Sequence, residues 1–242
     1  MICAKLFRRK LLSDRFSCWK KPGDRAIIKR KIMVDNHHKP LPRGLNGLIL
    51  CGGQSRRMQT DKSLLEYRRL PHWQYVQALL EPFVSETWVS CRKEQASQFA
   101  GTAGLLFDDD NSGMAGPAAG MLAAHRRFPA TGWLVVACDL PLVTAESIQA
   151  LVKGRDPSLQ ATAILNPEKE WPEPLLAIWE PSGLQVLEEN AGEGRCCPRK
   201  TLQQLTSALI SCSNPAELFN ANTPGERLLA EKELAEKLSG KS

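Results

Sequence analysis

The sequence predicts an α/β fold of three layers, in which helices cover both faces of a mainly parallel β-sheet. Short apolar runs that end in turn residues alternate along the chain with longer segments of helical periodicity. Several of the runs, such as NGLILC and WLVVAC, are apolar at nearly every position, which is typical of strands buried on both faces. Parallel neighbours need a crossover connection, so helices between the strands fit the same fold.

The first elements in the chain set this pattern. Asn46–Cys51 is an apolar run that stops at two glycines, which predicts a buried strand and a turn. Pro71–Phe83 carries its apolar side chains at helical spacing, which predicts a helix. The other expected strands are Thr87–Cys91, Gly104–Phe107, Trp133–Cys138, Ala161–Leu165, Leu175–Trp179 and Ala208–Cys212. The other expected helices are Pro117–Phe128, a helix capped by Thr144 that runs to Lys153, Ser182–Asn190, Arg199–Leu205 and a C-terminal helix.

The C-terminal helix has the clearest start signal. Thr223-Pro224 places a capping residue before a proline at the first helical position, and Glu226 completes a capping box. In a sheet of this kind, ligands bind at the carboxyl ends of the strands. The loops after Cys51, Phe107 and Cys138 are therefore expected to line one crevice.

Charge is distributed unevenly along the 242 residues, although the net charge is +6. Residues 1–44 hold 13 Lys/Arg and 3 Asp/Glu, whereas residues 45–242 hold 19 and 23. The body lacks the basic stripe with aromatics that nucleic-acid binding requires. No apolar run reaches the roughly 18 residues of a membrane span. These observations predict a cytoplasmic protein that binds neither nucleic acid nor membrane.

Residues 1–44 are expected to be a basic leader, either disordered or a start-site artefact, followed by one domain over 45–242. Basic residues interrupt each apolar stretch of the leader, so it does not match a secretory signal. Translation from Met33 would remove most of the positive charge. A basic arm for a membrane surface or an acidic partner remains the alternative.

The eight cysteines contain no C-x-x-C pair, which argues against a zinc site. Cys51, Cys91 and Cys138 end apolar runs and are expected to act as small buried hydrophobic residues. Without a secretion signal, all eight are expected to be reduced thiols.

Residues 50–62, LCGGQSRRMQTDK, predict a phosphate-binding loop. Gly52 and Gly53 let the backbone approach a ligand, and successive N–H groups can form an anion-binding concavity. Three basic side chains follow them: Arg56, Arg57 and Lys62. An ordinary glycine turn with solvated basic residues is the alternative.

Asp139 follows the apolar run WLVVAC directly. A carboxylate at such a strand end can hold Mg²⁺ together with phosphates and water, and a turn or capping aspartate is the alternative.

The glycine loop resembles the L-x-G-G-x-S-x-R-M-G-x-D-K signature of Rossmann-like nucleotidyltransferases, and within them most closely the molybdenum cofactor guanylyltransferases. Cys51 stands where that signature usually has alanine, and Gln59 where it has glycine. Further segments resemble the family in the same order: Asp108-Asp109-Asp110, Gly116-Pro117-Ala118-Ala119-Gly120, Ala137-Cys138-Asp139-Leu140-Pro141, Gly192-Glu193-Gly194-Arg195 and Asn220-Ala221-Asn222-Thr223-Pro224. The resemblance covers roughly residues 45–230.

The resemblance implies a role for each matching residue. Lys62 and Asp139 would be catalytic, with Asp139 also the Mg²⁺ ligand. The residues implied in nucleotide binding are Leu50, Gly52, Gly53, Arg57, Lys62, Asp109, Pro117 and Gly120. The residues implied in acceptor binding are Arg195, Asn220 and Asn222. For Asn222 a helix cap explains the residue almost as well.

The implied reaction is Mg²⁺-dependent transfer of GMP from GTP to molybdopterin, which gives the guanine dinucleotide cofactor and pyrophosphate. Molybdenum-insertion proteins and molybdoenzyme chaperones are the implied partners. Two alternatives stay open, because a fold does not fix a substrate. One is a cytidylyl or sugar-phosphate nucleotidyltransferase, and the other is a non-catalytic nucleotide-binding or cofactor-delivery module.

Overall fold

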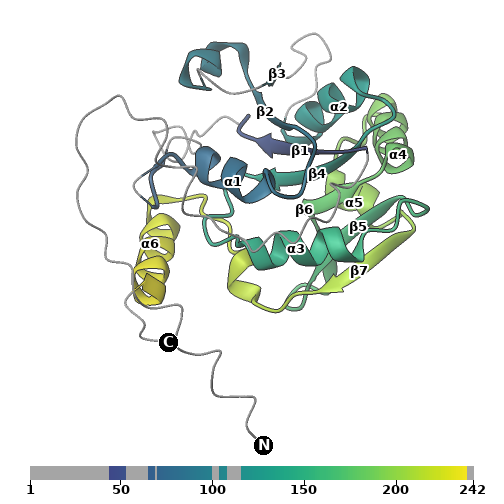
Figure 1. Cartoon of the computed structure of the whole chain (residues 1–242). Coiled ribbons are helices and arrows are strands. Elements are labelled where there is room, and N and C mark those ends of the chain that lie inside the picture. The colour runs from purple at the N-terminus through teal and green to yellow at the C-terminus, as the bar shows by residue number, and fades with distance from the viewer. Residues whose placement is uncertain (1–43, 53–64, 69, 100–103, 108–115, 239–242) are drawn as a thin grey trace, which may run out of the picture. The chain divides into compact units, whose positions relative to one another are not determined.

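The computed structural model describes residues 44–52, 65–68, 70–99, 104–107 and 116–238. These residues form a seven-stranded sheet with helices on both faces (Figure 1). The strand order is β3-β2-β1-β4-β6-β5-β7. The strands are β1 Leu45–Leu50, β2 Thr87–Cys91, β3 Leu105–Phe107, β4 Gly132–Ala137, β5 Ala161–Asn166, β6 Trp171–Trp179 and β7 Ser207–Ser211. The predicted three-layer fold is confirmed.

The sheet is mainly parallel. β1 pairs in parallel with β2 and β4, β2 with β3, and β5 with β7. β6 runs antiparallel to both β4 and β5. The chain builds outward from β1 to β3 and then returns to β4 on the other side of β1. In sheets of this kind, ligands bind at the carboxyl ends of the strands beside such a reversal, which here are β1 and β4.

Two apolar clusters attach the helical layers. α1 His72–Leu80 and α3 Ala145–Gly154 pack on one face of the sheet. On the other face lie α2 Pro117–Arg127, α4 Pro181–Gly192 and α5 Pro198–Leu202. The side chains of β1 alternate between the two clusters, with Ile49 in the first and Leu48 in the second. Every residue of β1 is buried, as the continuous apolar run predicts.

Three boundaries differ by three residues or more from those that the sequence predicts, and the others differ by at most two. α1 ends at Leu80 rather than at Phe83. β6 begins at Trp171 rather than at Leu175. Pro172 and Pro174 lack N–H donors and argue against a central strand. The β5–β6 pairing shifts register here, from Ala163↔Ala177 to Leu165↔Pro172, so β6 continues past both prolines with extra residues outside the ladder. α5 ends at Leu202 rather than at Leu205. Two 3₁₀ helices, η3 Lys93–Phe99 and η5 Pro215–Leu218, were not expected.

The predicted capping of α3 is wrong in its side-chain contact. Thr144 occupies the N-cap position, yet its side chain makes no capping hydrogen bond to the helix. Its Oγ1 instead donates to Glu217 Oε1 at 3.0 Å, and its backbone N–H donates to Glu217 Oε2 at 3.1 Å. Glu217 is buried, so it needs donors of its own. The hydroxyl therefore anchors η5 rather than capping the helix.

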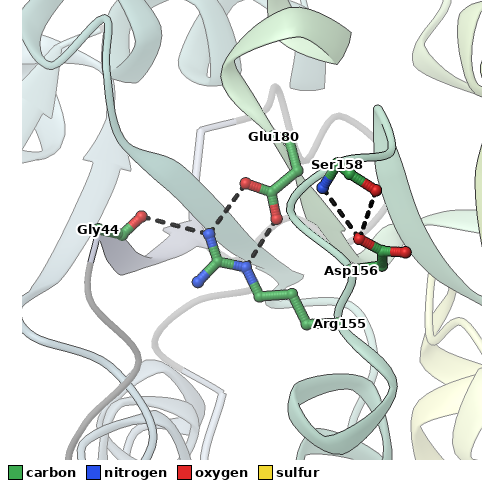
Figure 2. Close-up of polar contacts among 5 residues, drawn as sticks. All are labelled: Gly44, Arg155, Asp156, Ser158 and Glu180. Atoms are coloured by element: carbon green, nitrogen blue, oxygen red, sulfur yellow. Dashed lines mark hydrogen bonds and ion pairs between the residues drawn. The ribbon is translucent and has the colours of Figure 1, made fainter.

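A buried ion pair joins three elements at the amino edge of the sheet (Figure 2). Arg155, just after α3, donates from Nε to Glu180 Oε1 at 2.6 Å and from Nη2 to Oε2 at 2.9 Å. Arg155 Nη2 also lies 3.4 Å from the carbonyl oxygen of Gly44, before β1. The two side chains are 8% and 4% exposed. Such two-point geometry orients both groups and satisfies much of their hydrogen-bonding capacity.

Candidate active site

The carboxyl edge of the sheet carries the polar residues of the candidate site. Asp139 lies two residues beyond β4, directly after the buried Cys138. The ladder between β1 and β4 continues to this point, because the backbone N–H of Cys138 donates to Leu50 O at 3.1 Å. Asp139 therefore lies at the reversal point of the strand order, as the sequence predicts.

The Asn220–Asn222 segment lies against Asp139. The backbone N–H of Ala221 donates to Asp139 O at 2.9 Å. Asp139 and Asn220 are 81 positions apart in the sequence, yet this hydrogen bond brings their segments together. Two of the motifs that predicted a nucleotidyltransferase are thus adjacent in space.

The α6 helix, Pro224–Leu238, starts immediately after this segment. The predicted capping box is confirmed: the Glu226 N–H donates to Thr223 Oγ1 at 3.3 Å, and Thr223 N–H donates to Glu226 Oε2 at 2.8 Å. The Asn222 backbone N–H also donates to Glu226 Oε2 at 2.8 Å. Thr223 and Glu226 thus form the cap, and the Asn222 backbone takes part in it.

Glu173 on β6 is a candidate site residue that the sequence analysis missed. The antiparallel register pairs Val136 with Leu176, and its continuation places Glu173 opposite Asp139. Glu173 is 7% exposed. Its burial raises the pKa of the carboxyl group, the Asp139 carboxylate adds to the rise, and Lys169 and Arg199 oppose it. A glutamate between two prolines at a strand start was the available signal.

Arg199 on α5 provides a cation near Glu173. Its guanidinium lies 4.8 Å from the centroid of the Trp171 ring, at the start of β6. The positive charge also lowers the pKa of Glu173 against the dominant effect of burial. A guanidinium held over an indole suits an anionic or heteroaromatic ligand. Neither Arg199 nor Trp171 was predicted as a site residue, because they meet only when α5 packs on β6.

Three side chains of the α1 region hold the segment that follows Asp139. His72 Nε2 lies 3.1 Å from Leu140 O, Arg68 Nη1 donates to Pro141 O at 2.9 Å, and Tyr75 Oη donates to Val143 O at 3.2 Å. Burial lowers the pKa of His72 to about 4, so the neutral ring donates from Nε2. These contacts fix the backbone just beyond the Asp139 carboxylate.

Four of the residues implied in nucleotide binding can be placed. Leu50 ends β1, and the N–H of Gly52 donates to Ser90 O at 3.0 Å. Pro117 opens α2 after Gly116, whose φ of 86° favours glycine. Gly120 has a packing role, because a Cβ there would overlap Ser90 and lie 2.9 Å from Leu50 Cδ2. α2 therefore comes close to the ends of β1 and β2.

Arg195 lies in a different setting from Asp139. Its Nη2 donates to Asn190 Oδ1 at 2.6 Å, and it pairs with Glu193 in the connection between α4 and α5. A pocket of about 250 Å³ adjoins it, lined also by Lys200, Thr201 and the Cys196-Cys197 pair. The contacts of Arg195 thus belong to this connection rather than to the Asp139 segment.

Four other implied residues lie outside the described part of the chain: Gly53, Arg57, Lys62 and Asp109. The departure at Gln59 lies there too. Among the described residues, six cysteines are reduced, and Cys51, Cys91 and Cys138 are buried as expected. No helix in the described ranges is long and apolar enough to cross a membrane.

The family comparison matches the MobA-like NTP transferase domain over residues 47–237. The chain belongs to the MobA-like NTP transferase family. It is a nucleotidyltransferase, and the resemblance drawn from the motifs is confirmed. The match includes the strand ends and the Asn220–Asn222 segment that the structure brings together.

Curated relatives support this membership. The chain is 35% identical over 182 residues to a molybdenum cofactor biosynthesis bifunctional protein of Synechocystis, with 74% of this chain and 52% of that protein covered. It thus spans about half of that relative. It is 31% identical over 188 residues to a molybdenum cofactor guanylyltransferase of Pseudomonas fluorescens, with 76% of this chain and 92% of that protein covered.

Solved structures share the fold. Molybdopterin-guanine dinucleotide biosynthesis protein A of Archaeoglobus fulgidus superposes with a TM-score of 0.65 at 25% identity, over 79% of this chain and 99% of that chain. A nucleotidyl transferase of Methanothermobacter superposes with a TM-score of 0.66 at 16% identity, over 81% of this chain and all of that chain. At that identity the second likeness shows the fold alone.

Proposed function

We propose that this MobA-like NTP transferase moves GMP from GTP to molybdopterin and releases pyrophosphate. The observation that carries the proposal is the 2.9 Å hydrogen bond from Ala221 to Asp139. It joins two family-like motifs at the strand reversal, where nucleotides bind in such sheets. The names of the relatives, with 31–35% identity to this chain, favour the guanine nucleotide and the pterin acceptor.

The residues around Asp139 fit a Mg²⁺ ion. Asp139 and Glu173 come from neighbouring strands, and the charge on Asp139 makes ionisation of Glu173 harder. Two oxygen-donor carboxylates of this kind suit Mg²⁺, which binds one or two carboxylates together with phosphate and water. Asp139 would be the ligand, with Glu173 beside it. Bound Mg²⁺ would neutralise charge on the triphosphate and orient it.

In such a transfer the protein positions the reactants and stabilises developing charge, because the reaction needs little covalent catalysis from the protein. The Gly52-Gly53 backbone would hold phosphate oxygens, Arg57 would bind the triphosphate, and Lys62 would stabilise the charge that develops in the transition state. His72 and its neighbours would keep Asp139 in place through the Leu140–Val143 backbone. Asp109 would lie near the nucleoside.

The acceptor would lie on the β6 side of Asp139. Asn220 and Asn222 lie next to Asp139. Arg199, packed over the Trp171 ring, provides a cation and an aromatic face, and it lies close enough to Glu173 to lower its pKa. These groups suit an acceptor that carries both a phosphate and a fused ring. Arg195 would contact the acceptor from the connection between α4 and α5.

The test measures transfer from GTP labelled at the α-phosphate to molybdopterin, with Mg²⁺, by following labelled dinucleotide and pyrophosphate. We expect turnover with GTP and its loss by about 100-fold or more in Lys62→Ala, since removing a charge-stabilising donor costs that much. Lys153→Ala, on the far end of α3, is the control and keeps its activity.

Two outcomes would contradict the proposal. Faster transfer from labelled CTP than from GTP would make the chain a cytidylyltransferase. GTP binding without turnover in the presence of molybdopterin would make it a nucleotide-binding module.

A further inference from the structure

The cysteines at the ends of two adjacent strands carry an inference about chemical modification. Cys51 follows Leu50, the last residue of β1, and Cys138 follows Ala137, the last residue of β4. Leu50 and Ala137 are register partners in a parallel pair. The hydrogen bond from Cys138 N–H to Leu50 O extends this ladder by one residue. Cys51 and Cys138 are therefore neighbours across the two strands.

Their side chains point to the same face of the sheet. Both belong to the apolar cluster beneath α1 and α3, and they are 6% and 5% exposed. The two Sγ atoms are 2.9 Å apart. Adjacent strands lie about 4.8 Å apart, which is within the range of roughly 4.4–6.8 Å that disulfides span between Cα atoms. A bond between these sulfurs needs little movement of the backbone.

We propose that Cys51 and Cys138 are a site of oxidative modification and form an intrachain disulfide with peroxide. One thiolate attacks hydrogen peroxide to give a sulfenic acid and hydroxide. The second thiol then attacks that sulfur, the S–S bond forms, and water leaves. In sum, two thiols and one hydrogen peroxide give one disulfide and two waters, so the cysteines lose two electrons and the peroxide gains them.

The bond would change the carboxyl edge of the sheet. Disulfide sulfurs lie about 2.05 Å apart, so the two sulfurs must approach from their present 2.9 Å separation, partly by side-chain rotation and partly by a small shift of the strand ends. Cys51 directly precedes Gly52, and Cys138 directly precedes Asp139. Oxidation would therefore shift Gly52 and the Asp139 carboxylate slightly relative to each other. A misplacement of about 1 Å can slow a reaction by about 100-fold.

Cys91, at the end of β2, is a second possible disulfide partner for Cys51. The register of β1 and β2 pairs Leu50 with Ser90, and its continuation places Cys91 beside Cys51 on the other side. Cys91 is fully buried in the same apolar cluster. A link that forms between Cys51 and Cys138 and leaves Cys91 reduced would reflect the 2.9 Å contact rather than general thiol reactivity.

The experiment oxidises the full chain with hydrogen peroxide, blocks the remaining thiols, digests with trypsin without reductant, and maps the linked peptides by mass spectrometry. We expect residues 44–56 joined to residues 128–153, with a loss of two hydrogen atoms that a reductant reverses. A parallel sample equilibrates with glutathione disulfide, so that slow access to the buried thiols does not hide the product.

The control variants separate the possibilities. Cys51→Ala introduces the residue that the resembling signature carries there, and it should abolish the link. Cys91→Ala should keep it. A link from residues 44–56 to the Cys91 peptide, 70–92, would overturn the proposal, and so would reduced Cys51 and Cys138 in both samples. None of these readouts involves a nucleotide, so they stand apart from the proposed function.

With GTP turnover as a second readout, oxidation should slow the wild type by about tenfold or more and leave Cys51→Ala unchanged.

Discussion

The two edges of the sheet both bury a glutamate, but they surround it differently. At the amino edge, Glu180 accepts two hydrogen bonds from Arg155, at 2.6 and 2.9 Å (Figure 2). At the carboxyl edge, Glu173 faces the like charge of Asp139, and the backbone N–H of Leu175 lies 3.5 Å from its Oε1. A matched pair fixes structure, whereas two close carboxylates store repulsion that a bound cation relieves. We expect the amino edge to serve stability and the carboxyl edge to serve chemistry.

The largest expected effect is at the amino edge. Arg155→Met leaves the buried Glu180 carboxylate without its guanidinium, which should lower the free energy of unfolding by about 3–5 kcal/mol. Urea denaturation followed by circular dichroism measures it. The double variant with Glu180→Gln should recover much of the loss. A loss below about 1 kcal/mol for Arg155→Met would show that the pair does not fasten this edge.

At the carboxyl edge, the largest effect should be on rate rather than on stability. Asp139→Asn keeps the size of the side chain but removes the charge, and should slow nucleotidyl transfer by about 100-fold or more. The midpoint of urea denaturation should stay near the wild-type value. The opposite result would be a variant that loses as much stability as Arg155→Met while its folded fraction transfers nucleotide at the wild-type rate. Asp139 would then be a structural residue, and the two edges would not differ in role.

Acid should loosen the carboxyl edge first. His72 has a pKa of about 4 in the folded chain, against the ordinary histidine value of 6.5, because it is buried and faces the Arg68 cation. Between pH 6.5 and about 4, the unfolded chain binds a proton that the folded chain does not. The free energy of unfolding should therefore fall by about 1.4 kcal/mol for each unit by which the pH is lowered in that window. Above pH 6.5 the neutral ring contributes in full.

Unfolding free energies measured across this window, with His72→Gln as the comparison, test the assignment. Gln keeps an N–H donor but does not titrate, so the slope with pH should become shallower by that amount. An unchanged slope would mean that another group controls the acid response.

The smallest effect should be the most telling one. Burial raises the pKa of the Glu173 carboxyl group, which means that its charged form is unfavourable in the folded chain. Glu173→Gln removes that charge, so the free energy of unfolding should stay the same or rise slightly. Mn²⁺ binding, followed by electron paramagnetic resonance in the presence of GTP, should weaken by about tenfold. Glu188→Gln on the surface of α4 is the matched control. If the variant is destabilised but binds Mn²⁺ as tightly as the wild type, Glu173 stabilises the fold and does not help to hold the metal ion.

Local patterns in the sequence were enough for much of this. Apolar runs predicted each of the seven strands, and the Thr223-Pro224 start with Glu226 predicted the α6 cap. Asp139 was predicted from its place at a strand end together with the family resemblance of its motif. Long-range pairing was not predictable in this way. Glu173 becomes a site residue only when β6 lies antiparallel to β4, and Arg155 meets Glu180 only after α3 and β6 pack.

The prolines show why the boundary of β6 was missed. Pro172 and Pro174 each remove a ladder donor, which in isolation marks a loop. The β5–β6 pairing shifts register between Ala163↔Ala177 and Leu165↔Pro172, so β6 continues past both prolines with extra residues outside the ladder. The partner strand therefore decides the outcome, and it lies outside any local window.

The central claim is that the carboxyl edge binds a guanine nucleotide through Asp139. The most direct measurement is isothermal titration of the wild type and of Asp139→Asn with GTP and then CTP, each with Mg²⁺. The account predicts that the wild type binds GTP at least about tenfold more tightly than CTP and that Asp139→Asn weakens Mg²⁺-dependent GTP binding by a similar factor. Equal binding of GTP by both proteins, or a preference of the wild type for CTP, would contradict it.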